Sequence, residues 1–98
     1  MTDSWWIVLL GRTLHWARLR EREAGTAEVL DHSGGLHVYD SLDSARSMLL
    51  DAGYVEFDGL DEDDALERGF SLDEVAPPRA DSEQALLALM SLELGRNA

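Results

Sequence analysis

Apolar residues in this chain follow two different periods, and the change from one to the other comes near residue 40. Before that point they roughly alternate with polar residues, which is the period of a β-strand, whereas those in 42–52 recur every three or four positions, as on a helix face. Strands that precede helices, instead of alternating with them, indicate an α+β fold. We therefore predict an antiparallel sheet of four to six strands, with two or three helices packed mainly on one face.

Short turn signals divide the first forty residues into four predicted strands. The reversals are marked by Gly11, by Gly25 and by the pair at 34–35. The strands between these turns are expected at 5–10, 13–23, 26–31 and 36–39, and they form an N-terminal meander.

The second part of the chain carries helix caps. Ser41 is a suitable N-cap and Gly53 a suitable C-cap for a helix at 42–52. The remaining elements are predicted as strands at 54–57 and 70–75, a short helix at 61–68, and a final helix that Asp81 opens, that runs to about Leu94 and that stops at Gly95.

The chain has 98 residues, 45% of them hydrophobic, without an internal repeat, so residues 1–98 are expected to form a single domain. It contains no cysteine, which excludes disulfides, thiolate metal sites and thiol catalysis. The apolar run at 5–10 is too short to span a bilayer, and Asp3 lies where a signal peptide carries positive charge. We therefore expect a cytoplasmic protein with no membrane segment.

Acidic residues dominate the charge. Twenty aspartates and glutamates stand against eight arginines and no lysine, which gives a net charge of -12. The exclusive use of arginine is typical of a G+C-rich bacterial genome. Residues 40–98 hold fifteen acidic residues and four arginines, a net charge of -11. Such a chain is not expected to bind nucleic acid or an anionic membrane, and a basic protein partner is favoured.

The densest group of carboxylates offers one candidate metal site, with Asp58, Asp61 and Asp63 as the weak candidate ligands. Carboxylate oxygens suit Ca²⁺ or Mg²⁺, but the spacing does not match an EF-hand loop. The alternative is that Asp61 caps a helix whose acidic first turn, Glu62 to Asp64, favours the positive end of the helix dipole. Capping accounts for the cluster more fully, so we expect no bound metal.

The histidines offer a second candidate metal site. If 34–35 is a two-residue hairpin loop, His32 lies opposite His37 across the ladder. This pair could hold zinc, with Asp31 or His15 as a third ligand. The alternative is that these histidines are solvated turn residues.

Trp5 and Trp6 make both faces of the first strand apolar. If helices cover only one face of the sheet, the other face exposes an aromatic patch, with Trp16, that fits a partner protein. The alternative is that the first strand is central and buried on both sides. The final helix is also apolar over more than one face, Leu87 and Met90 included, so it is either sandwiched or in contact with a partner.

Three arginines, Arg18, Arg20 and Arg22, share one face of the second strand. They could bind a carboxylate or phosphate. The favoured alternative is that they pair across strands with acidic residues such as Glu28.

The chain carries no phosphate loop, nucleophile elbow or zinc-protease motif, so neither an enzyme nor a cofactor is expected. We predict a small acidic protein-protein interaction module, such as an adaptor, inhibitor or immunity-type protein, that engages a basic partner. Homodimer formation through the first strand or the last helix is a related expectation. The alternative function is metal or small-ligand binding at the 58–64 turn or at His32 and His37. The predicted partner-binding residues are Trp5, Trp6, Trp16, Glu62, Asp63, Asp64, Leu87 and Met90.

Overall fold

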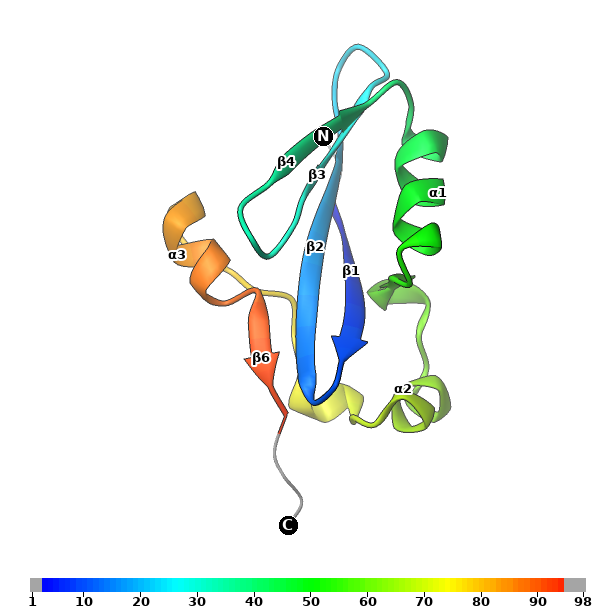
Figure 1. The fold of residues 1–98 in the computed structure, drawn as a ribbon, viewed down its shortest axis with the longest axis vertical. Coiled ribbons are helices and arrows are strands. Elements are labelled where there is room, and N and C mark those ends of the chain that lie inside the picture. The colour runs from blue at the N-terminus through cyan, green and yellow to red at the C-terminus, as the bar shows by residue number, and fades with distance from the viewer. Residues whose placement is uncertain (1–2, 95–98) are drawn as a thin grey trace.

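The computed structural model describes residues 3–94, which form a six-stranded antiparallel sheet with three α-helices (Figure 1). The predicted α+β class is confirmed. The strands are β1 (Asp3–Leu10), β2 (Thr13–Glu21), β3 (Ala27–Leu30), β4 (Leu36–Tyr39), β5 (Val55–Glu56) and β6 (Ser91–Glu93). The helices are α1 (Leu42–Asp51), α2 (Glu62–Arg68) and α3 (Glu83–Ala88), with two short 3-10 helices, η1 (Phe57–Gly59) and η2 (Leu72–Glu74).

The first four strands form the predicted meander, since each pairs antiparallel with the strand before it. β1 has β5 on its other side, so the strand order is β4-β3-β2-β1-β5. β6 pairs with the first residues of β2, which β3 does not reach. β4 is therefore an edge strand, and its outer edge has no strand neighbour within residues 3–94.

One face of the sheet packs against α1 and is called the α1 face. Its core joins Trp6 and Leu19 of the sheet to Ala45 and Leu49 of the helix. The two helix residues are four positions apart and therefore lie on the same side of α1. This is the apolar stripe that the helical period predicted.

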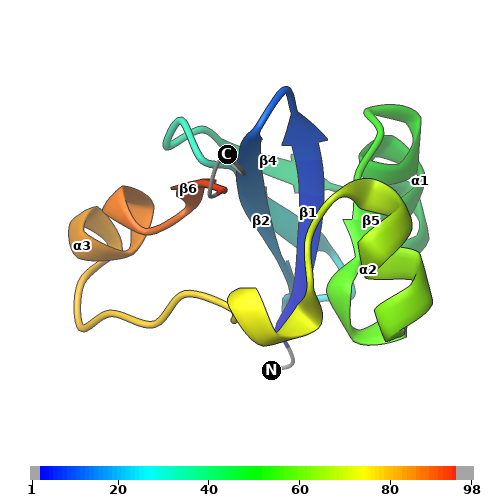
Figure 2. The ribbon, with the colours of Figure 1, turned by 90° about the horizontal axis from the view of Figure 1, so that it is seen from below.

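The opposite face, called the α3 face, packs against α3, and Figure 2 shows α1 and α3 on opposite sides of the sheet. Its core joins Ile7, Trp16 and Leu30 of the sheet to Leu86 and Met90. Residues in and around α2 and η2, the elements that follow β5 in the chain, belong to the same core. β1 is thus an interior strand between β2 and β5, and its middle residues Trp6 and Ile7 are buried on opposite faces, which agrees with the sequence alternative of a first strand covered on both sides.

Side-chain caps begin α1 and α2 as predicted. The Ser41 hydroxyl accepts a hydrogen bond from the backbone of Ser44, and Asp61 forms a capping box with Asp64. α2 ends at Gly69, whose φ of 99° lies in the left-handed region that glycine favours. All helices are short, the longest having ten residues, and none within residues 3–94 has the length and apolar character needed to cross a bilayer.

The strand predicted at 70–75 is wrong, since this segment contains η2. The carboxylate of Glu74 accepts a hydrogen bond from the backbone N–H of Ser71. The carboxylate of Glu62 accepts from the Ser71 hydroxyl and from the backbone of Leu72. These acceptors satisfy the backbone locally, so the segment needs no strand partner.

The last helix is shorter than predicted, because α3 ends at Ala88 and β6 follows. The backbone N–H of Trp16 donates to the carbonyl of Met90 at 2.8 Å, which holds the chain after α3 against β2. The predicted continuation of the helix to Leu94 is therefore wrong. Gly95, its predicted stop, lies outside the described residues.

Candidate functional site

The tryptophans do not form an exposed patch. Trp6 and Trp16 have exposed fractions of 1% and 2%. Trp6 is covered by α1, where the guanidinium of Arg46 lies 5.5 Å from its ring centre. Trp5 is half-buried on the opposite face and contacts Trp16 edge-on at 5.9 Å. The expectation of an exposed tryptophan face is therefore wrong, because helices cover both faces of the sheet.

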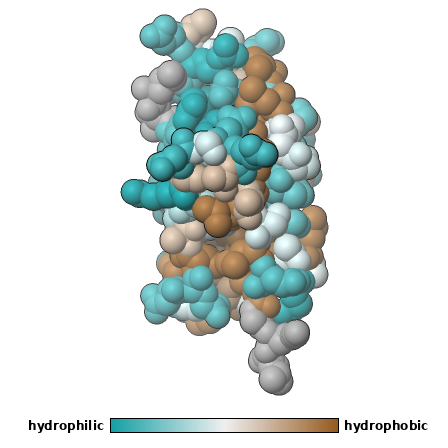
Figure 3. All heavy atoms as spheres, turned by 90° about the vertical axis from the view of Figure 1, so that its left-hand side faces the viewer, coloured by the Kyte–Doolittle hydropathy of each residue, from teal (hydrophilic) through white to brown (hydrophobic). Residues whose placement is uncertain are grey.

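Exposed apolar side chains lie elsewhere. Met90, a predicted anchor, is fully buried, and Leu87 packs against the core of the α3 face. Leu89 at the end of α3 remains about half exposed, as do Leu36 and Val38 of β4. Figure 3 shows apolar side chains between hydrophilic ones on the side of the molecule that carries α3. The apolar surface available to a partner therefore includes the edge strand β4.

The acidic cluster at the start of α2 serves the fold. Asp61 and Asp64 accept hydrogen bonds from each other's backbone, and Glu62 connects α2 to η2. The other two candidate ligands, Asp58 and Asp63, are exposed. Within residues 3–94, no three histidine, aspartate or glutamate side chains are placed to share a metal ion. The structure therefore gives this cluster the capping role that the sequence favoured.

His32 and His37 do not face each other. His37 pairs with Val29, and the turn between β3 and β4 spans residues 31–35. The His32 ring instead stacks on His15, with 3.9 Å between the ring centres. Burial, with the nearby charge of His32 as a second cause, lowers the pKa of His15 and favours its neutral form. The predicted cross-strand histidine pair is therefore wrong.

Asp31 is the reason for the longer turn. Its Oδ1 accepts hydrogen bonds from the backbone N–H of Ser33 at 3.0 Å, from the Ser33 hydroxyl at 2.7 Å and from the backbone N–H of Gly35 at 2.9 Å. Its Oδ2 lies 3.1 Å from Nε2 of His37. Burial alone would raise the pKa of Asp31, but the hydrogen bonds outweigh it and hold this pKa below its usual value. Asp31 is therefore a carboxylate at neutral pH.

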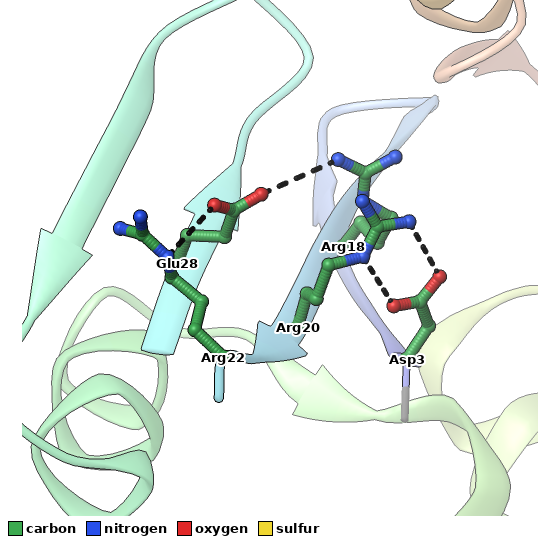
Figure 4. Close-up of polar contacts among 5 residues, drawn as sticks. All are labelled: Asp3, Arg18, Arg20, Arg22 and Glu28. Atoms are coloured by element: carbon green, nitrogen blue, oxygen red, sulfur yellow. Dashed lines mark hydrogen bonds and ion pairs between the residues drawn. The ribbon is translucent and has the colours of Figure 1, made fainter. Parts of the chain in front are cut away.

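The arginines pair with carboxylates on the α3 face (Figure 4). Arg20 donates two hydrogen bonds to Asp3, at 2.7 and 3.0 Å. Glu28 on β3 lies 3.8 Å from Arg18 and 3.7 Å from Arg22. The predicted pairing with Glu28 is confirmed. Because each of these guanidinium groups already faces a carboxylate, the row is not an open anion site.

Two adjoining hollows lie between α1 and the β3–β4 hairpin. The inner hollow has a volume of about 160 Å³ and the outer one about 590 Å³, and both are lined by Tyr39 and Met48. Together they form a groove beside the edge strand, called the β4–α1 groove below. Its lining residues are Ala17, Val29, Asp31, His37, Val38, Tyr39, Asp40, Asp43, Ser44, Ser47, Met48, Leu49, Ala52 and Tyr54.

The β4–α1 groove is acidic. Within residues 3–94, Asp31, Asp40 and Asp43 line it and no arginine does, and the chain has no lysine. Burial, together with the nearby charge of Asp31, raises the pKa of Tyr54, so this phenol stays protonated at neutral pH. Carboxylates combined with aromatic rings attract cations. The groove is therefore suited to positively charged groups.

Sequence reasoning missed most of this groove. It named Asp31 only as a third zinc ligand, and it did not single out Tyr39, Met48 or Tyr54. One usable signal was present, because only Asp40 and the cap Ser41 separate β4 from α1. So short a connection keeps the helix next to the edge strand.

Comparison with protein-family models, curated proteins and solved structures finds no match for the chain. A function for the β4–α1 groove must therefore follow from its own shape, charge and chemistry.

Proposed function

We propose that this protein is a protein-binding module that holds an extended, basic segment of a partner protein along β4, in the β4–α1 groove. The observation that carries the proposal is the position of an acidic groove beside a free strand edge. An extended segment can add its backbone to such an edge and place alternate side chains in neighbouring pockets. Backbone pairing then supplies affinity, and the groove supplies selectivity for charge.

The two side-chain rows of β4 define what the partner strand presents. Leu36 pairs with Leu30 of the α3-face core, and Val38 shares that face, whereas Tyr39 packs against the core of the α1 face. A strand added to β4 continues both rows. In the added partner strand, every second residue therefore lies beside the exposed Leu36 and Val38 on the α3 face. The intervening partner residues lie beside Tyr39 on the α1 face. The matching partner segment alternates apolar with basic residues.

Long-range charge supports a basic partner. The segment 40–74, which runs from the end of β4 through η2, holds twelve acidic residues and two arginines, a net charge of -10. This negative potential raises the rate at which a basic segment encounters the groove. It also disfavours acidic competitors.

Pairing of two copies through the first strand, one route expected from the sequence, is obstructed in this fold by β5, which pairs with the middle of β1 at Trp6 and Ile7. β1 has β2 on one side and β5 on the other. Two copies would also bring together two chains that each carry a net charge of -12. A different, basic protein is the partner that the charge favours.

Calorimetry with short peptides tests the proposal. The peptide acetyl-Val-Lys-Val-Lys-Val-amide is expected to bind with a Kd on the order of 100 µM, since a single short strand buries a small interface. Binding weakens as the salt concentration rises, because the attraction is partly electrostatic. The control peptides are acetyl-Val-Glu-Val-Glu-Val-amide and acetyl-Lys-Lys-Val-Val-Val-amide, which change the charge or the alternation. Equal binding of all three, or no binding of the first, would contradict the proposal.

A further inference from the structure

The inner hollow of the β4–α1 groove combines an apolar floor with one carboxylate. Ala17, Val29 and Leu49 are buried and form the floor, and Asp31 is the acidic residue in the wall. The half-buried Tyr54 lies close enough to Asp31 for that charge to act on its phenol. A volume of about 160 Å³ suits one side chain with an aliphatic stem and a cationic end.

The two oxygens of Asp31 differ in what they can still accept. Oδ1 already accepts three hydrogen bonds within the hairpin turn. Among residues 3–94, the hydrogen-bond partner of Oδ2 is the imidazole of His37, whose side chain is 53% exposed and so has room to turn away. Oδ2 is therefore the oxygen of this carboxylate that can accept from a ligand, in place of or beside the His37 imidazole.

We propose that the inner hollow is a recognition pocket for a lysine side chain of the partner segment and that it prefers lysine to arginine. The inference rests on the proposed function, and it adds which side chain of the partner segment the inner hollow recognises. An ammonium group is a point charge that one acceptor oxygen satisfies, and its four-carbon stem covers the apolar floor. A guanidinium fork binds best to two free oxygens, and Asp31 offers one.

Matched peptides test this preference. The lysines of acetyl-Val-Lys-Val-Lys-Val-amide are replaced by arginine in one version and by norleucine in another, so that charge and stem are varied separately. The lysine peptide is expected to bind about fivefold more tightly than the arginine peptide, and the norleucine peptide most weakly. Equal or tighter binding of the arginine peptide would overturn the inference.

Asp31→Asn provides the matched variant. The asparagine carbonyl keeps an acceptor for the turn, while the charge on Oδ2 is lost. The lysine preference is expected to disappear in this variant but to persist in Asp63→Asn, which removes the same charge from α2 outside the groove. Amide NMR spectra check that both variants fold. A lysine preference that survives in Asp31→Asn would contradict the role of the hollow.

A small-molecule titration separates this inference from the proposed function. The n-butylammonium ion represents the lysine stem and charge without a peptide backbone, and n-butylguanidinium is its control. At millimolar concentrations n-butylammonium is expected to shift the amide signals of Val29, Leu49 and Tyr54 in the native protein but not in Asp31→Asn. Peptide binding without these shifts would overturn the lysine pocket alone. Shifts with the amine but no peptide binding would overturn strand addition and keep the pocket.

Discussion

Asp31 and His37 are six positions apart, and Oδ2 of the carboxylate lies 3.1 Å from Nε2 of the imidazole. This contact connects the turn of the hairpin to β4 at the inner hollow of the β4–α1 groove. The same carboxylate shapes the turn through its other oxygen. The turn and the proposed lysine pocket therefore share one side chain, and only a substitution that preserves the turn separates the two roles.

Asp31→Ala is expected to destabilise the protein by about 1–3 kcal/mol, since it leaves the donors of the turn without their acceptor. Asp31→Asn retains a side-chain carbonyl and is expected to cost less, about 0.5–1 kcal/mol. Urea unfolding of both variants measures the difference. Equal losses in the two variants would show that the turn does not depend on the acceptor.

Stability is expected to fall in acid because of Asp3 and Asp31. The hydrogen bond from Arg20 lowers the pKa of Asp3 despite its partial burial, and the pKa of Asp31 is also lowered. A carboxyl whose pKa is lower in the folded state adds stability above its unfolded pKa, near 3.8, and loses it as the pH falls through the folded value. The contribution of these two carboxyl groups should therefore be level near neutral pH and decline below about pH 4, in addition to the decline below about pH 6.5 that the lowered pKa of His15 produces.

The variants Asp3→Asn and Asp31→Asn provide the control for this pH dependence. Each should flatten the acid limb of the stability curve, because the substituted group no longer titrates. A curve that keeps its full slope in both variants would contradict the assignment.

Val38→Lys is expected to weaken binding of acetyl-Val-Lys-Val-Lys-Val-amide at least about tenfold, because a charged residue on an edge strand blocks strand addition. The Val38 side chain is more than half exposed, so stability should change by no more than about 0.5 kcal/mol. Leu50→Lys is the matched control, since Leu50 is equally exposed on α1 and does not line the groove. Equal effects of the two substitutions would indicate that only net charge matters.

Met90→Ala is expected to destabilise the protein by about 2–5 kcal/mol, because it leaves a cavity in the core of the α3 face. Leu89→Ala, at the neighbouring exposed position, is expected to cost less than about 0.5 kcal/mol. Thermal or urea unfolding compares them. A small loss for Met90→Ala would show that the segment between α3 and β6 contributes little to the folded core.

Local patterns in the sequence were sufficient to predict the first half of the fold. Apolar or alternating runs separated by turn signals predicted β1 to β4, and the cap at Ser41 with the helical period predicted α1. They failed where distant residues decide the structure. The apolar run after Glu83 looks helical throughout, but the hydrogen bond from Trp16 to Met90 draws its end into the sheet.

The candidate site was less predictable than the fold. A two-residue hairpin loop would place His32 opposite His37, but the hydrogen bonds that Asp31 accepts favour a longer turn and change the register. The β4–α1 groove depends on how α1 crosses β4, which no local pattern specifies. The charge of residues 40–98 was visible in the sequence, whereas its position beside a free strand edge was not.

Strand addition to β4 is tested most sharply by an NMR titration of the isotopically labelled protein with acetyl-Val-Lys-Val-Lys-Val-amide. Strand addition predicts that the largest amide shifts occur in β4 and along the groove side of α1, at Val38, Tyr39 and Met48 among others. Shifts concentrated in the acidic first turn of α2, or spread evenly over the surface, would contradict it. Either of those results would show attraction by charge without strand addition.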